Sequence, residues 1–189
     1  MERNGTPTRF ATRTSVLDLR SGRLVASLES FTVIKDGRRY TSPDVSFWGV
    51  TVARDDRTFY ATMSTRGRTY LVRGDLAART VTTVRDNVEC PSLSPDGTRI
   101  VFKKRVDADG GRVPWRLFVL DLASLRETPL AEQHTVDDQA VWLDDAHVAY
   151  ALPVPDSSTY DVWSVPADGS GAPSKIIAGA SSPAPLSGS

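Results

Sequence analysis

The sequence has one cysteine, no long apolar run and no net charge across its 189 residues. The single thiol, Cys90, excludes an internal disulfide and argues against a metal site built from cysteines. No stretch approaches the roughly 18 unbroken apolar residues of a membrane span, and the polar N-terminus lacks the apolar core of a signal peptide. We therefore expect no membrane span and no export signal in the chain as written.

The charge of the chain also excludes one class of partner. The 23 basic and 23 acidic residues cancel, which argues against a nucleic-acid-binding protein held by phosphate contacts. The charge is unevenly spread, because residues 1–94 hold 15 basic against 10 acidic side chains and residues 95–189 hold 8 against 13. Such asymmetry can steer a partner, although drift of surface charge along a chain also explains it.

Helical periodicity is scarce, because the apolar runs are short, alternate with polar residues and are interrupted by Gly, Pro and Asp. The interruption recurs: Asp55, Asp96 and Asp144 stand in three related segments, RDDRTFYA, SPDGTRIVF and LDDAHVAY, at spacings of 41 and 48 residues. Each Asp is followed by a strand and, after a loop, by a second strand. Four-stranded units of about 40–50 residues in tandem are typical of a β-propeller.

The most complete of these turns is formed by Ser94, Pro95, Asp96 and Gly97. Proline fixes φ at the second position, aspartate bonds its own backbone, and glycine accepts a positive φ. In the other two copies a second aspartate replaces the glycine. We expect those two turns to adopt a looser or type I geometry.

The segments PSLSPDGTRIVF and WRLFVLDL resemble the WD40-like propeller repeat of TolB, and the resemblance covers most of residues 14–180. The chain is similar to TolB-like translocation proteins of actinobacterial type. This resemblance implies a β-propeller in the periplasm or on the cell surface that acts as a binding scaffold for protein partners. It brings no catalytic residues and no cofactor with it.

The repeat predicts an incomplete propeller. Three whole blades are expected at residues 44–87, 88–134 and 136–181, preceded by the two outer strands of another blade at 14–29. Propellers usually close with four to eight blades, and an open one leaves bare strand edges. We expect the chain to be the C-terminal part of a longer propeller. The alternative is that two or more chains assemble to close a ring.

Three segments fall outside these blades. Residues 1–13 are expected to be a frayed N-terminus, and residues 182–189 a flexible tail rich in Ser, Pro and Gly. The segment 30–43 is expected to form a hairpin inserted between blades, because a Lys-Asp-Gly turn stands between apolar residues. Arg38 and Arg39 then lie either on a binding protrusion or on an ordinary excursion of the chain.

The sequence contains no convincing catalytic or metal-binding motif. The G-x-S-x-G nucleophile elbow, the phosphate loop and the H-E-x-x-H zinc helix are all absent. His134 and His147 have no Cys or third His near them, so we expect no zinc site. Asp107 and Asp109 suit the start of a calcium loop, but Phe118 stands where that loop requires a bidentate glutamate.

Our candidate interaction surface is one mouth of the central channel. Glu89 and Asp137 lie one position apart in the repeat register, which places both carboxylates near the same mouth, and Asp138 adjoins them. Polar solvation of the mouth is the simpler explanation of this acidic group. Trp48 and Trp142 lie on expected inner strands, where a large ring serves either recognition or packing between blades.

We therefore expect an all-β partial propeller that is not an enzyme and serves as an interaction module of an exported protein. A protein partner is expected, and a nucleic-acid partner, a metal or a cofactor is not. Two alternatives stay open. One is a propeller that accompanies a serine peptidase whose catalytic domain is absent from this chain, and the other is a sensor that binds a small ligand.

Overall fold

The computed structural model describes residues 13–106 and 114–184. The segment 107–111 considered above as a calcium loop, and most of the two termini, lie outside these described residues. The described elements are strands joined by turns, together with one short 3-10 turn, η1 (Leu28–Ser30). Within the described ranges no helix is long and apolar enough to cross a membrane.

The largest sheet has six strands in the order β4-β3-β8-β7-β6-β5. Four of them are consecutive antiparallel strands, and the other two form a hairpin at the outer edge. Their bounds are β5 (Ser46–Val52), β6 (Thr58–Thr65), β7 (Arg68–Asp75), β8 (Thr80–Asp86), β3 (Thr32–Lys35) and β4 (Arg38–Tyr40).

Two four-stranded antiparallel sheets follow, and a two-stranded sheet precedes them all. The second sheet contains β9 (Glu89–Leu93), β10 (Arg99–Arg105), β11 (Trp115–Asp121) and β12 (Glu127–Pro129). The third contains β13 (Val141–Trp142), β14 (His147–Pro153), β15 (Tyr160–Pro166) and β16 (Ser174–Ile177). The N-terminal pair is β1 (Ser15–Leu17) and β2 (Leu24–Ser27).

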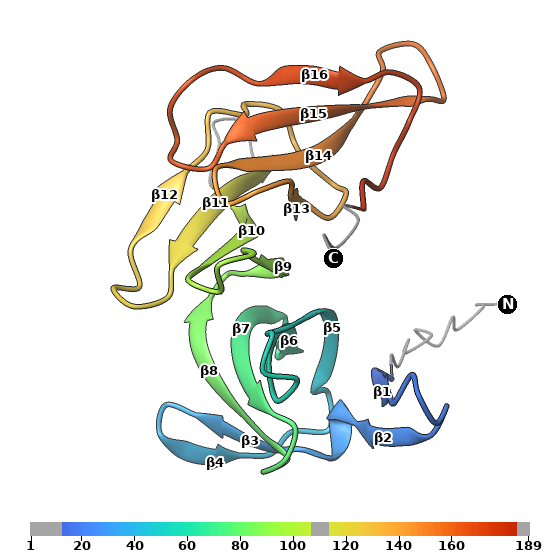
Figure 1. Cartoon of the computed structure of the whole chain (residues 1–189). Helices are drawn as coiled ribbons and strands as arrows, with labels where there is room; N and C mark the ends of the chain where they lie inside the picture. The colour runs from blue at the N-terminus through green and yellow to red at the C-terminus, as the bar shows by residue number, and fades with distance from the viewer. Residues whose placement is uncertain (1–12, 107–113, 185–189) are drawn as a thin grey trace, which may run out of the picture.

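The sheets stand one after another around an arc, with β5, β9 and β13 on its inner side (Figure 1). The β1–β2 pair and the β13–β16 sheet lie at the two ends of the arc, which does not close into a ring within the described residues. Four-stranded antiparallel sheets arranged around a centre define a β-propeller. The predicted all-β, partial-propeller fold is therefore confirmed.

An apolar cluster fills the space between each pair of neighbouring sheets. Packing on both faces explains why β6 is buried from Phe59 to Met63 and β10 from Ile100 to Lys103, instead of at alternate residues. Trp142 is buried in the last of these clusters, where its indole Nε1 donates to the backbone oxygen of Ser92 at 2.9 Å. Trp142 therefore serves packing between sheets, one of the two roles considered for it.

The β3–β4 hairpin does not lie where the sequence predicts it. The sequence predicts an excursion between blades at 30–43, but β3 pairs in parallel with β8 and extends the outer edge of the first large sheet. Its apolar residues explain the difference, since Val33 is buried in the same cluster as Val81. Arg38 and Arg39 are exposed on the edge strand β4, where charged side chains discourage pairing with another chain.

The three aspartate turns share one hydrogen bond. In each, a side-chain Oδ1 accepts the backbone N–H two residues later, at 3.0 Å for Asp55, 2.9 Å for Asp96 and 2.7 Å for Asp144. Gly97 has a φ of 74°, and Asp56 at the matching position has a φ of 53°. Asp56 thus adopts the same left-handed conformation as Gly97, because a short polar side chain tolerates it.

Candidate binding site at one end of the inner strands

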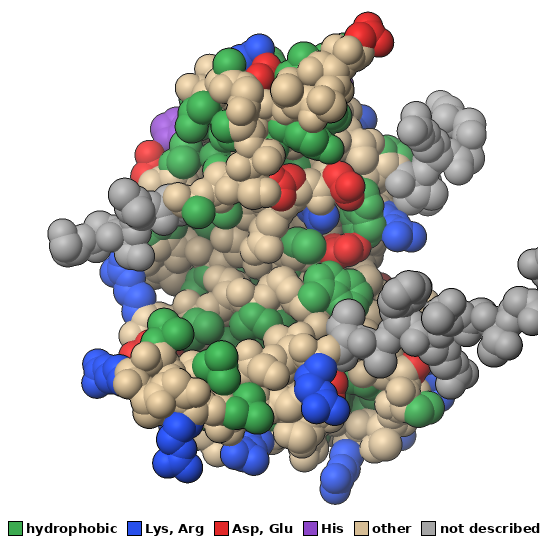
Figure 2. All heavy atoms as spheres, turned by 90° about the vertical axis from the view of Figure 1, so that its right-hand side faces the viewer, with side chains coloured by type: hydrophobic (Ala, Val, Ile, Leu, Met, Phe, Trp, Pro, Cys, Tyr) green, Lys and Arg blue, Asp and Glu red, His purple; other side chains and the backbone are tan. Residues whose placement is uncertain are grey.

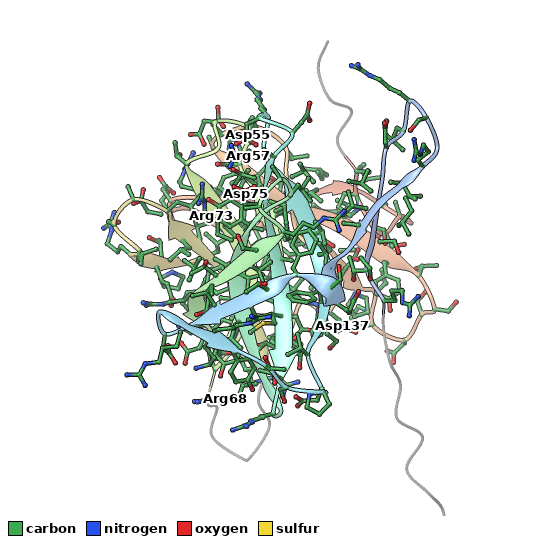
Figure 3. All side chains as sticks on the ribbon, turned by 90° about the horizontal axis from the view of Figure 1, so that it is seen from below. Asp55, Arg57, Arg68, Arg73, Asp75 and Asp137 are labelled. Carbon is green, nitrogen blue, oxygen red and sulfur yellow. The ribbon has the colours of Figure 1, made fainter. Side chains whose placement is uncertain are left out.

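The two ends of the blades carry different side chains. Asp55, Arg57, Arg73 and Asp75 gather at one end of the first large sheet, where Arg57 Nη2 forms an ion pair with Asp75 at 2.7 Å (Figure 3). Arg68 lies at the opposite end of the same sheet, because β7 runs from one end to the other. Arg57 and Asp75 neutralise each other at the first end, so the Arg68 end is the better candidate for binding.

A groove of about 490 Å³ opens at the Arg68 end, between the first and second large sheets. Half-buried Trp48 from β5 and Glu89 from β9 face it together with Arg68 and Arg105. The groove thus brings together an indole ring, a carboxylate and two guanidinium groups from four strands. Such a wall can accept a mixed polar and apolar segment of a partner.

A buried lysine stands behind this groove. Lys103 on β10 is the cross-strand neighbour of Glu89, and its ammonium donates to the backbone oxygen of Asp137 at 2.6 Å. Burial raises the pKa of the nearby Cys90 thiol. The Lys103 ammonium opposes this rise in pKa, and the Glu89 and Asp137 carboxylates add to it. Glu89 and Asp137 therefore both lie near Cys90, and that thiol stays protonated at neutral pH.

Asp138 has a different role from its neighbour. Its Oδ2 accepts the backbone N–H of Ser182 at 2.8 Å, and its Oδ1 accepts the backbone N–H of Gln139 at 2.8 Å. Asp138 therefore ties the segment after the last strand back to the start of the third sheet. Arg38 and Arg39 are also separated from the groove, because β4 and β5 are the two opposite edges of the six-stranded sheet.

Sequence reasoning missed Arg68, Arg105 and Lys103. The first two stand at the end of a strand, next to a turn or loop, which is where side chains of a propeller reach its rim. Counting such strand-end cations would have found them. The position of Lys103 had no comparable signal, because a strand reading IVFKKR does not tell which lysine is turned into the core.

A second, more apolar groove of about 540 Å³ lies between the second and third sheets, with Leu152, Trp163 and the exposed His134 among its walls. Beside it, the buried Glu132 carboxylate accepts the Tyr150 hydroxyl at 2.5 Å and the backbone N–H of His134 at 2.6 Å. Burial alone would raise the pKa of Glu132, but these hydrogen bonds leave it lowered. Glu132 is therefore ionised, and it anchors the link between two blades.

Each of the two histidines lies beside a carboxylate. His134 Nδ1 lies 2.7 Å from Glu132, and His147 Nδ1 lies 3.1 Å from Asp144. Among the described residues, no three His, Cys, Asp or Glu side chains come together in a way that could hold a metal ion.

No known family model matches this chain, and no curated protein sequence does. Solved structures do match it. TolB from Acinetobacter baumannii superposes with a TM-score of 0.60 at 16% identity, over 86% of this chain and 37% of that one. An oligogalacturonate lyase in complex with manganese superposes with a TM-score of 0.56 at 18% identity, over 85% of this chain and 45% of that one.

The β-propeller domain of the Trilobed protease from Pyrococcus furiosus, which has an open velcro topology, gives a TM-score of 0.53 at 14% identity. That match covers 71% of this chain and 43% of the domain. The chain thus spans less than half the length of each of these three structures. At such identities the likeness concerns the fold, and the fold is that of a TolB-like β-propeller.

Proposed function

We propose that this TolB-like β-propeller is a non-enzymatic interaction module that binds a protein partner at the Arg68 end of its inner strands. The groove between Trp48 and Glu89 carries this proposal. It combines a half-exposed aromatic ring with charged groups at its rim, which is the composition of protein interfaces. The fold offers this groove on stacked sheets, so the side chains that line it are held on rigid strands.

The division into blades is part of the proposal. We assign one blade to residues 44–87, a second to 88–134, a third to 136–181 and a half blade to 14–29. The sheets of β5–β8, β9–β12, β13–β16 and β1–β2 support these ranges. The hairpin of β3 and β4 is then an addition to the outer edge of the first blade.

The likeness to TolB supports a place outside the cytoplasm and a role in an envelope assembly, as a propeller on which partner proteins meet. A second candidate function is supported by the likeness to the propeller domain of the Trilobed protease. In that case the chain accompanies a peptidase domain encoded beside it. Determining the coding sequence on both sides of the chain separates the two, because only the second requires a hydrolase domain there.

Site-specific photo-crosslinking tests the interaction site. A photo-reactive residue replaces Trp48 in the groove, and a control replaces exposed Arg57 at the other end of the same sheet. In an envelope extract, we expect one protein to form an adduct from position 48 and not from position 57. Excess unlabelled chain should abolish this adduct, and excess Trp48→Ala chain should not. Equal adducts at both positions, or none at position 48, would refute the site.

A further inference from the structure

We propose that the partner docks through an acidic polypeptide segment that lies along a basic flank of the first blade. This inference rests on the proposed function and adds the chemistry of the partner. The basic flank is defined as Lys35, Arg38, Arg66, Arg68, Arg85 and Arg105. All six stand at the Arg68 end of their strands or in the adjoining turn.

Two grooves meet at Arg68 on this flank. The first, of about 400 Å³, lies between the β3–β4 hairpin and the end of the blade, with Lys35 and Arg85 among its walls. The second is the groove of Trp48 and Arg105 described above. Because Arg68 lines both grooves, an extended segment can run from one to the other past its guanidinium group.

Most of these cations lack a carboxylate partner. Of the six, Lys35 pairs with Asp36 and Arg85 pairs with Glu127, whereas the guanidinium groups of the other four have no carboxylate within 4.0 Å among the described residues. The Asp44 carboxylate lies beside Arg66 but accepts its backbone N–H, at 2.6 Å. Arg105 instead lies over the Trp115 ring at 4.5 Å. Stacking fixes a guanidinium plane and leaves its edge free to donate two parallel hydrogen bonds to a carboxylate.

The seam behind the flank adds to the positive charge. Lys104 and Arg116 come from the neighbouring strands β10 and β11, and Arg85 comes from β8 of the first large sheet. The Glu127 carboxylate pairs with Lys104 and with Arg85. Arg116 is the cross-strand neighbour of Lys104, and its Nη1 is buried with no hydrogen-bond partner among the described residues. An excess of cations in a partly buried seam strengthens the attraction for an anionic segment at its mouth.

The observations favour an acidic polypeptide over a nucleic acid. Asp86 lines both grooves, Asp36 lines the first and Glu89 lines the second, and their carboxylates would repel a continuous polyphosphate. A peptide can instead place its carboxylates opposite Arg68 and Arg105 and an apolar side chain against Trp48. The molecule is also polarised: on the face in Figure 2, most Lys and Arg lie in the lower half and most Asp and Glu in the upper half.

Fluorescence anisotropy with defined probes tests the inference. The probes are a labelled peptide of alternating Glu and Ser, its Gln counterpart of equal length, and a labelled oligothymidylate. We expect the Glu peptide to bind more tightly than either of the other two. We also expect its affinity to fall as salt is raised, because exposed charges are screened within a few ångströms at high ionic strength, roughly 3 Å at 1 M.

Matched arginine variants locate the contact. Arg68 and Arg73 are both exposed on β7 but stand toward opposite ends of it, so Arg68→Gln and Arg73→Gln remove the same charge from two places (Figure 3). We expect Arg68→Gln to lower the affinity for the Glu peptide by up to about fivefold, which is the range for one exposed ion pair. We expect Arg73→Gln to leave this affinity unchanged. Thermal melting confirms that both variants remain folded.

The inference is overturned if the Gln peptide binds as tightly as the Glu peptide, if the two variants behave alike, or if the oligothymidylate binds most tightly. These results are separable from failure of the proposed function. If a specific adduct still forms at position 48, the scaffold stands and only the acidic class of partner is wrong. If that adduct is also missing, both proposals fail.

Discussion

Gly74, the last residue but one of β7, leaves a space that a neighbouring side chain fills. Gly74 pairs across the sheet with Phe59, and a Cβ built on Gly74 would lie 2.0 Å from Cζ of that ring. The ring is almost fully buried, at 1% exposed, and cannot move aside into solvent. The strand therefore tolerates glycine here because the phenyl ring covers it, although glycine usually weakens a strand.

We predict that Gly74→Ala lowers the free energy of unfolding by about 1–3 kcal/mol, because overpacking forces the ring or the strand to shift. Urea denaturation of four proteins checks this: the wild type, Gly74→Ala, Phe59→Leu and the double variant. The double variant should lose at least about 0.5 kcal/mol less than the sum of the two single losses. Strict additivity would show that the ring does not oppose the added methyl group.

At the scale of elements, the β3–β4 hairpin is part of the core and not a free protrusion. Val33 faces the apolar cluster and Ile34 faces the other side of the hairpin, half-buried. We predict that Val33→Ala costs about 2 kcal/mol of unfolding free energy, for two buried methyl groups and the cavity they leave. Ile34→Ala is the matched control and should cost clearly less. Equal, near-zero losses for both would mean that the hairpin is detached.

The sequence allowed the repeated sheets to be predicted, because their turns and alternating strands are local patterns. Asp55, Asp96 and Asp144 mark the turns, and each of them accepts the expected backbone hydrogen bond. The parallel pairing of β3 with β8 is a contact between distant segments, and no residue in either strand encodes its partner. The same limit applies to the site. The repeat register predicted that Glu89 and Asp137 lie near one end of the blades, but it did not predict that Lys103 is buried between them.

At the scale of the whole molecule, hydrogen-bonded carboxylates make the free energy of unfolding depend on pH in the acidic range. Hydrogen bonds from Ser42 lower the pKa of Asp44 to about 2, and the Arg57 side chain does the same for Asp75. For Asp96, burial opposes the shift, but bonds from Ser94 and Thr98 bring the pKa to about 2. The folded state therefore keeps these carboxylates ionised at a pH at which the unfolded chain has begun to take up protons.

Because these pKa values are lower in the folded state than in the unfolded state, their contribution is complete above about pH 4. We predict that it is lost as the pH falls from about 4 toward 2, and that the urea midpoint decreases over this range. An Asp96→Asn variant should show a smaller decrease between these pH values than the wild type. A midpoint that stays constant from pH 4 to pH 2 would contradict the prediction.

The parallel pairing of β3 with β8 also has a kinetic consequence. Thr32 pairs with Thr80, and β4, β5, β6 and β7 lie between them in the chain, whereas the other pairings of that sheet join successive strands. Closing so long a loop is slow compared with forming hairpins. During synthesis the hairpin leaves the ribosome before β8, so it can pair with the blade only when β8 has emerged.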